Sequence, residues 1–114
     1  MIIIAGTIDF ASAEQRDEAV AASTELQLAS RDEPGCRAYS FAADPCVAER
    51  VQVHELWADE SSLAAHFGHP NYLQMRRLLE GGGLVAIKVK KYRCDLSEPV
   101  YDSTFTPRAD FFTA

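Results

Sequence analysis

Four short runs of alternating or β-branched residues predict the strands of this chain. The first run is rich in isoleucine and ends at polar residues, which is typical of a largely buried strand. The second and third runs alternate in polarity around a turn at Asp44-Pro45, which predicts an antiparallel pair. The fourth run alternates so that one side of the strand is apolar and the other is polar and faces solvent. These runs cover residues 2–10, 36–43, 50–58 and 84–93.

A long helix is predicted between the first two strands. Ser12 followed by Gln15 matches a capping box, which starts a helix there. The segment 33–35, Glu-Pro-Gly, ends it, because proline disfavours helical geometry in the residue before it and glycine tolerates a left-handed turn. Small or apolar side chains recur at helical spacing and are expected to pack on the sheet. They are Ala19, Ala22, Leu26 and Ala29.

A second helical region is predicted between the third and fourth strands. Asp59 is placed as its cap, and His69-Pro70 interrupts it, with Pro70 suited to begin the next helical turn. The glycine run 81–83 ends it abruptly. It follows a helix and lacks the lysine and hydroxyl of a phosphate loop, so we interpret it as a flexible connection to the last strand. The buried stripe after Pro70 is expected to be Tyr72, Met75, Leu78 and Leu79.

The order strand, helix, strand, strand, helix, strand predicts an α+β fold of the ferredoxin-like kind, βαββαβ, with an antiparallel sheet. Helices then cover one face of the sheet and leave the other bare, which predicts a homodimer. We expect one domain over residues 1–94. Residues 95–114 carry spaced aromatic side chains without a clear period, and we interpret them as an arm that packs on the domain or on the dimer partner.

Composition narrows the classes of function. The chain of 114 residues carries a formal net charge of −6, which disfavours binding to nucleic acid. Basic residues nevertheless gather in two places, at 76–77 and at 88–93, and these groups form either solvated faces or an anion site. The apolar start lacks a basic leader and is too short to span a membrane, and the three cysteines show no metal-binding or disulfide spacing. A reducing cytoplasm is the expected compartment, with no membrane partner.

Several motifs appear together in one order along the chain. They are Glu33-Pro34-Gly35-Cys36, Tyr39, Asp44-Pro45, the segment 55–60 (ELWADE), His66 and His69-Pro70-Asn71-Tyr72. On these motifs the chain resembles the antibiotic biosynthesis monooxygenase family, including its quinol monooxygenase branch, over about residues 3–92. This resemblance implies a dimeric α+β barrel that oxygenates a phenol, hydroquinone or polyketide with dioxygen and without metal, flavin or haem.

Chemistry of this kind needs a dry aromatic pocket, a proton acceptor and donors that hold an anion. His66, Trp57 and Asn71 are therefore the candidate catalytic residues. Each has a structural alternative: Trp57 as core, His66 as a satisfied structural histidine, and Glu55 as a hydrogen-bonded or ion-paired carboxylate. The candidate substrate-binding residues are Tyr39, Glu55, Phe67, Tyr72, Met75 and Arg76.

Two rival functions remain open at this stage, and a metal site is weighed separately. The same fold also suits a non-catalytic dimeric protein that binds a small ligand or is associated with stress. A haem-degrading relative needs an imidazole late in the second helical region, where this chain has Arg76 and Arg77. His66 and His69 stand at helical spacing for a metal, but Pro70 breaks the geometry and no third ligand is fixed, so no metal site is expected.

Overall fold

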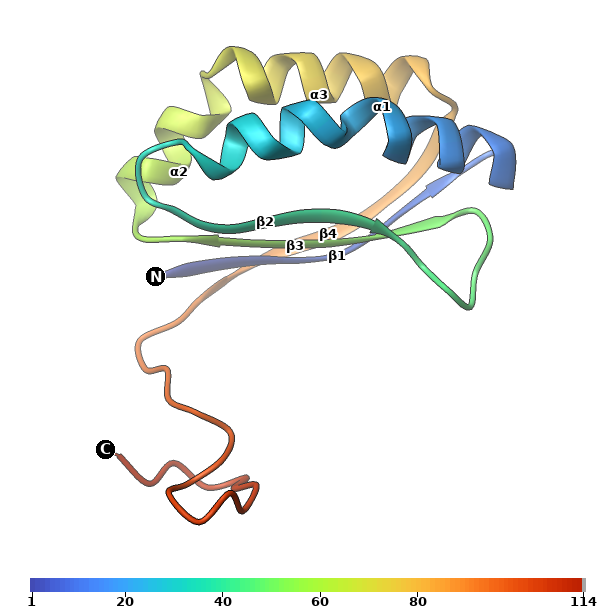
Figure 1. The fold of residues 1–114 in the computed structure, drawn as a ribbon. Helices are drawn as coiled ribbons and strands as arrows, with labels where there is room; N and C mark the ends of the chain where they lie inside the picture. The colour runs from blue at the N-terminus through green and yellow to red at the C-terminus, as the bar shows by residue number, and fades with distance from the viewer. Residues whose placement is uncertain (114) are drawn as a thin grey trace.

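The computed structural model describes residues 1–113 and confirms the α+β, ferredoxin-like fold. Its single sheet has the strand order β2-β3-β1-β4, and every pairing is antiparallel. The helices lie in one layer over one face of this sheet, as Figure 1 shows. The elements are β1 (Ile2–Phe10), α1 (Ala13–Arg31), β2 (Cys36–Ala43), β3 (Arg50–Trp57), α2 (Glu60–Phe67), α3 (Pro70–Gly81) and β4 (Leu84–Arg93).

The core lies between the sheet and the helices. Because side chains alternate along a strand, β3 buries every second residue beneath the helical layer, and β1 does the same except at Gly6, which is only partly buried. Leu63 of α2 and Met75 of α3 close the core from above. The buried apolar residues that the sheet contributes are Ile2, Ile4, Ile8, Phe10, Tyr39, Val51, Val53 and Trp57.

Gly6 allows β1 and β4 to pair closely in the middle of the sheet. It lies opposite Val89 and has φ of 152°, a conformation that residues with a side chain rarely adopt. A Cβ atom at this position would stand 2.0 Å from the backbone oxygen of Lys88. Glycine is therefore required where β4, which carries part of the cavity wall, joins the central strand.

The inner face of α1 differs from the predicted stripe. Ala19 is buried as expected, but Ala22 and Ala29 are exposed and Leu26 is only half-buried. Polar side chains occupy the buried face instead, because they bond to the edge strand. The Gln27 side-chain amide donates to the Phe41 carbonyl and accepts from the Phe41 N–H, both at 3.0 Å. Buried Ser23 and Ser30 complete this face. None of the helices within residues 1–113 is long and apolar enough to cross a membrane.

The uncovered face of the sheet carries one apolar row. Ile3 of β1 pairs with Leu56 of β3 on one side and with Tyr92 of β4 on the other, and Ala38 of β2 extends the row beyond Leu56. The Tyr92 side chain is 51% exposed. This row lies at the end of the sheet where β4 ends.

Residues 95–113 form an extended arm that leaves the end of β4. Figure 1 shows it on the side of the sheet opposite the helices. The rings of Tyr101 and Phe105 stack with centroids 4.8 Å apart, and Tyr101 forms a β-bridge with Pro107. Phe105 is nevertheless 80% exposed, and Phe111 is exposed as well. Ala114, the last residue of the predicted arm, lies outside the described residues.

Candidate active site

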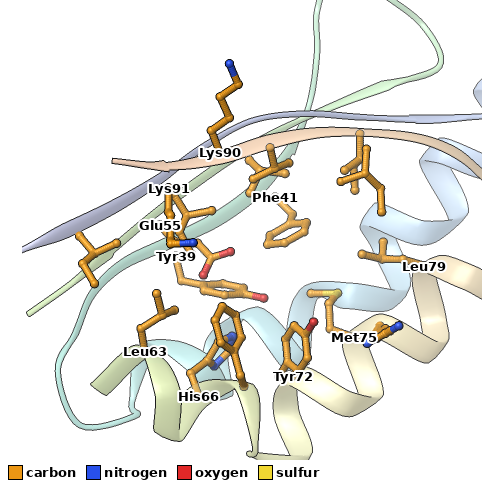
Figure 2. A pocket seen from close by; sticks show the side chains of 18 of the residues that line it. Tyr39, Phe41, Glu55, Leu63, His66, Tyr72, Met75, Leu79, Lys90 and Lys91 are labelled. Atoms are coloured by element: carbon orange, nitrogen blue, oxygen red, sulfur yellow. The ribbon is translucent and has the colours of Figure 1, made fainter. Parts of the chain in front are cut away.

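A cavity of about 1000 Å³ lies between the sheet and helices α2 and α3. Figure 2 shows Tyr39 and Glu55 reaching into it from the strands, with His66 and Tyr72 reaching in from the helices. The aromatic rings are close: His66 lies 5.7 Å from Tyr39 and 5.5 Å from Tyr72 between ring centroids. A space of this size with mostly apolar walls and a few polar groups is typical of small-molecule sites.

A buried carboxylate holds the imidazole of this cavity. The Nδ1 atom of His66 lies 3.0 Å and 3.1 Å from the two carboxylate oxygens of Glu33, and both side chains are buried. The Asn71 side-chain amide donates to the same carboxylate at 3.2 Å. Glu33 therefore links the end of α1 to residues of α2 and α3.

The local backbone structure positions Glu33 and Asn71. Glu33 follows the last turn of α1, where its N–H donates to the Ser30 carbonyl. Gly35, with φ of 81°, then turns the chain into β2, and its carbonyl accepts from the Ala58 N–H. Asn71 lies in the first turn of α3, which is capped by the His69 ring accepting from the Asn71 N–H.

The contact with Glu33 fixes the roles of the two imidazole nitrogens. An ionised carboxylate can only accept hydrogen bonds, so Nδ1 of His66 is the nitrogen that carries the proton. Its Nε2 atom makes no hydrogen bond to any residue in the range 1–113. In the neutral ring Nε2 holds a lone pair, and His66 lines the cavity. The arrangement can therefore accept a proton from a bound molecule.

Trp57 supports the opposite side of this imidazole. Its ring is fully buried and lies 4.5 Å from the His66 ring between centroids. Its indole Nε1 donates to Oε1 of Glu55 at 3.0 Å. The pKa of Glu55 is raised from 4.5 to about 7, chiefly by burial; the hydrogen bond from Trp57 opposes the rise and the negative charge of Glu33 adds to it. Glu55 is thus a second group of the cavity that can carry a proton.

Tyr39 supplies a hydroxyl that stays protonated. Burial is the chief cause that raises its pKa far above the ordinary value, and the charge of Glu55 adds to the effect. Its ring is almost completely buried between Phe41 and His66. The phenol can therefore donate a hydrogen bond to an oxygen anion in the cavity throughout the usual pH range.

The predicted site residues divide into two groups. Seven of them line the cavity: Tyr39, Glu55, His66, Phe67, Tyr72, Met75 and Arg76. Trp57 and Asn71 are absent from the cavity wall. Trp57 contacts the ring of His66, which is part of the wall, and Asn71 donates to Glu33, which lies behind the wall and holds His66. They are placed to position other groups, and the structural interpretation of Trp57 as a core residue matches its burial.

Two further residues have partners of their own. The Arg76 guanidinium lies 2.8 Å from a carboxylate oxygen of Glu80 one turn along α3. His69, which sequence spacing pairs with His66, uses its Nδ1 atom as the cap of α3. Among residues 1–113 no group of three His, Cys, Asp or Glu side chains is arranged to hold a metal ion.

Glu33 is the residue of this site that sequence reasoning missed. The segment 33–35 indicates the end of a helix, and nothing in its spacing points to His66, which lies 33 positions away. The available signal was that Glu33 and His66 belong to two motifs of the same family pattern. A buried imidazole needs a hydrogen-bond partner, and this requirement would have prompted a search among the acidic residues of the other motifs.

The fold and the cavity together define an α+β domain whose small-molecule site lies between a four-stranded antiparallel sheet and the helices above it. The sequence pattern of the antibiotic biosynthesis monooxygenases matches residues 1–78, and this chain belongs to that family. The resemblance found in the motifs is thereby confirmed.

Known proteins extend the comparison. Over 71 residues the chain is 32% identical to the uncharacterized protein sll1783 of Synechocystis; the match covers 62% of this chain and 48% of that protein, or about half its length. A solved structure of a candidate antibiotic biosynthesis monooxygenase from Deinococcus radiodurans has a TM-score of 0.79 at 22% identity, covering 90% of this chain and 100% of that one. The protein PA3566 of Pseudomonas aeruginosa has a TM-score of 0.64 at 28% identity, covering 82% and 92%.

Proposed function

We propose that this protein is a cofactor-independent monooxygenase that oxidises an aromatic, quinol-like or polyketide molecule with dioxygen. The observation that carries the proposal is the buried imidazole whose Nδ1 atom is held by Glu33 while Nε2 is left for a ligand in an aromatic cavity. Membership of the antibiotic biosynthesis monooxygenase family supports the same class of reaction.

In the proposed reaction His66 acts as the general base. Its Nε2 atom removes the hydroxyl proton of a phenol, and the phenolate passes one electron to dioxygen. The two radicals combine in a new C–O bond at a ring carbon that carries a hydrogen and lies ortho or para to the hydroxyl. His66 returns its proton to the peroxide, the O–O bond breaks, and the carbon gives up its hydrogen as a proton to the hydroxide that leaves. One oxygen atom stays as the new quinone carbonyl and the other leaves as water, so the substrate supplies all four electrons.

The cavity walls have defined roles in this proposal. Tyr39 keeps its proton and is suited to donate to the phenolate or peroxide oxygen, where charge develops. Tyr72 and Phe67 pack edge to face with centroids 5.2 Å apart and supply an aromatic wall for the substrate ring. Trp57 and Asn71 are positioning residues that hold His66 and Glu33.

The test is oxygen consumption by the purified protein, stripped of metals, with a panel of hydroquinones and polyphenols. The proposal expects oxygen uptake that depends on the protein and on a substrate that can form a phenolate. Binding of the same molecules without oxygen uptake would favour the ligand-binding function.

We further propose that the working form is a homodimer in the reducing cytoplasm, with the arm packed on the partner. The apolar row of the uncovered sheet face supports an interface there, and the exposed aromatic rings of the arm lie on that side of the sheet. The three cysteines are unpaired, which suits a reducing compartment.

Light scattering at micromolar concentration is expected to give twice the 12.6 kDa mass of one chain. Truncation after Asp95 should weaken the dimer and lower Tm, because it removes exposed apolar surface that an interface of roughly 2,000 Å² would cover. A full-length chain that runs only as a monomer would refute the dimer. An unchanged dimer and Tm after truncation would show that the arm is a passive tail.

A further inference from the structure

Four basic residues crowd onto β4 in a protein whose formal net charge is −6. They are Lys88, Lys90, Lys91 and Arg93. The register with β1 places Lys91 and Arg93 on one face of the sheet and Lys88 and Lys90 on the other. Lys91 and Arg93 lie opposite Ile4 and Ile2, whose side chains are buried beneath the helices, so they project to the cavity side of the sheet. Lys88 lies opposite Thr7 and projects to the uncovered face.

Lys91 reaches toward the polar end of the cavity. Ile4 pairs with Glu55 on one side and with Lys91 on the other, so these two charged side chains flank it on the same face. Figure 2 shows Lys91 directed into the cavity toward Glu55, whereas Lys90 points away from it. Lys91 and Arg93 both line the cavity.

Neither of these two cations has an anionic partner among residues 1–113. No carboxylate oxygen there lies within 4.0 Å of Lys91 or Arg93, whereas Arg76, another cation of the wall, is paired with Glu80. The Glu33 carboxylate is already engaged by His66 and Asn71. Burial holds the pKa of Glu55 at about 7, so at neutral pH it supplies only part of a charge.

This arrangement discriminates between neutral and anionic ligands. Lys91 is exposed to solvent in the free protein, so a ligand that covers its ammonium group removes water from an unpaired cation, which is costly. A neutral ligand leaves that cost uncompensated. A ligand that carries its own carboxylate replaces the lost water with a charge-assisted hydrogen bond.

We propose that the cavity selects aromatic molecules that carry a carboxylate, and that Lys91 pairs with that carboxylate while Arg93 provides a second positive charge beside it. The inference deepens the proposed function, on which it rests for the reaction but not for binding. The aromatic ring lies among Tyr39, His66 and Tyr72, and the carboxylate points toward β4. Lys91 is thus a specificity-determining residue for acidic aromatic substrates.

Calorimetric titration with 2-naphthoate and with 2-naphthamide tests this inference without any turnover. The two probes have nearly the same shape and differ in charge. The wild-type dissociation constant is expected to be about tenfold lower for the carboxylate, which is the size of one charge-assisted hydrogen bond. Lys91→Met should abolish this preference and Lys91→Arg should keep it. Lys88→Met, which removes a cation from the opposite face of the same strand, should leave it unchanged.

The possible failures are distinguishable. Equal binding of the two probes by the wild type, or equal effects of Lys91→Met and Lys88→Met, overturns the inference even if hydroquinones are oxidised. Loss of the dimer in Lys91→Met with unchanged probe preference overturns it too, because the cation then serves the acidic arm of the partner. A Lys91-dependent preference without oxygen uptake by any phenol supports the inference and refutes the proposed oxygenase.

Discussion

Glu33→Gln is expected to lower kcat by about a hundredfold or more while leaving the fold intact. The glutamine oxygen can still accept from Asn71, and its amide then donates to Nδ1 of His66. That reversal moves the imidazole proton onto Nε2 and removes the lone pair that accepts the substrate proton. A general base typically contributes 10² to 10⁴ in rate, roughly, so its loss is large.

Oxygen uptake and Tm are measured on the same preparations, with Asp32→Asn as the matched control at the neighbouring exposed position. The control should keep full turnover. His66→Ala is a poorer test, because it leaves the buried Glu33 carboxylate without its imidazole partner and is expected to cost about 3 to 5 kcal/mol of stability. Turnover in Glu33→Gln within threefold of the wild type would remove His66 from the role of base.

Raising the pH from 5 to 8 is expected to destabilise the wild type through Glu55. The pKa of this carboxyl is raised to about 7 in the folded protein from an ordinary value of 4.5, chiefly by burial. Between these values the folded state binds more protons than the unfolded state, so stability falls as the pH rises and is constant above the folded pKa. A difference of one pKa unit corresponds to about 1.4 kcal/mol, so the free energy of unfolding is expected to fall by roughly 3 kcal/mol between pH 5 and pH 8.

Urea unfolding of the wild type and Glu55→Gln at both pH values isolates this effect. Glutamine keeps an acceptor for the Trp57 indole and cannot ionise. The variant should therefore gain roughly 3 kcal/mol relative to the wild type between pH 5 and pH 8. Comparing the two pH values cancels any fixed cost of burying the amide. Parallel pH profiles for the two proteins would show that Glu55 does not titrate in this range.

The strands and helix starts could be predicted because they depend on local signals. The Ser12 capping box appears as a hydrogen bond from the Gln15 N–H to the Ser12 hydroxyl, and Asp59 caps α2 in the same way. The inner face of α1 could not be predicted from apolar spacing. Gln27 is buried because it satisfies both backbone groups of Phe41, a contact that exists only after the strand is in place.

In the candidate site, too, the residues marked by local motifs could be predicted, whereas contacts between distant segments could not. His66 and the residues around it could be named from the family motifs and the helical spacing, and seven of the nine predicted residues line the cavity. The partner of His66 could not be named, because Glu33 reaches it only through the turn after α1. That Lys91 lies near Glu55 could not be predicted either, because it depends on the register by which both residues pair with Ile4 of β1.

A reaction under ¹⁸O₂, with metal-stripped protein and a phenol that has a hydrogen para to its hydroxyl, is the decisive test of the proposed oxygenase. The product is expected to be a quinone that carries one ¹⁸O atom in its new carbonyl, formed at a rate proportional to protein and unaffected by chelators. Glu33→Gln should form this quinone about a hundredfold more slowly. A product without the label, or a rate that follows added metal in place of protein, would refute a cofactor-independent oxygenase.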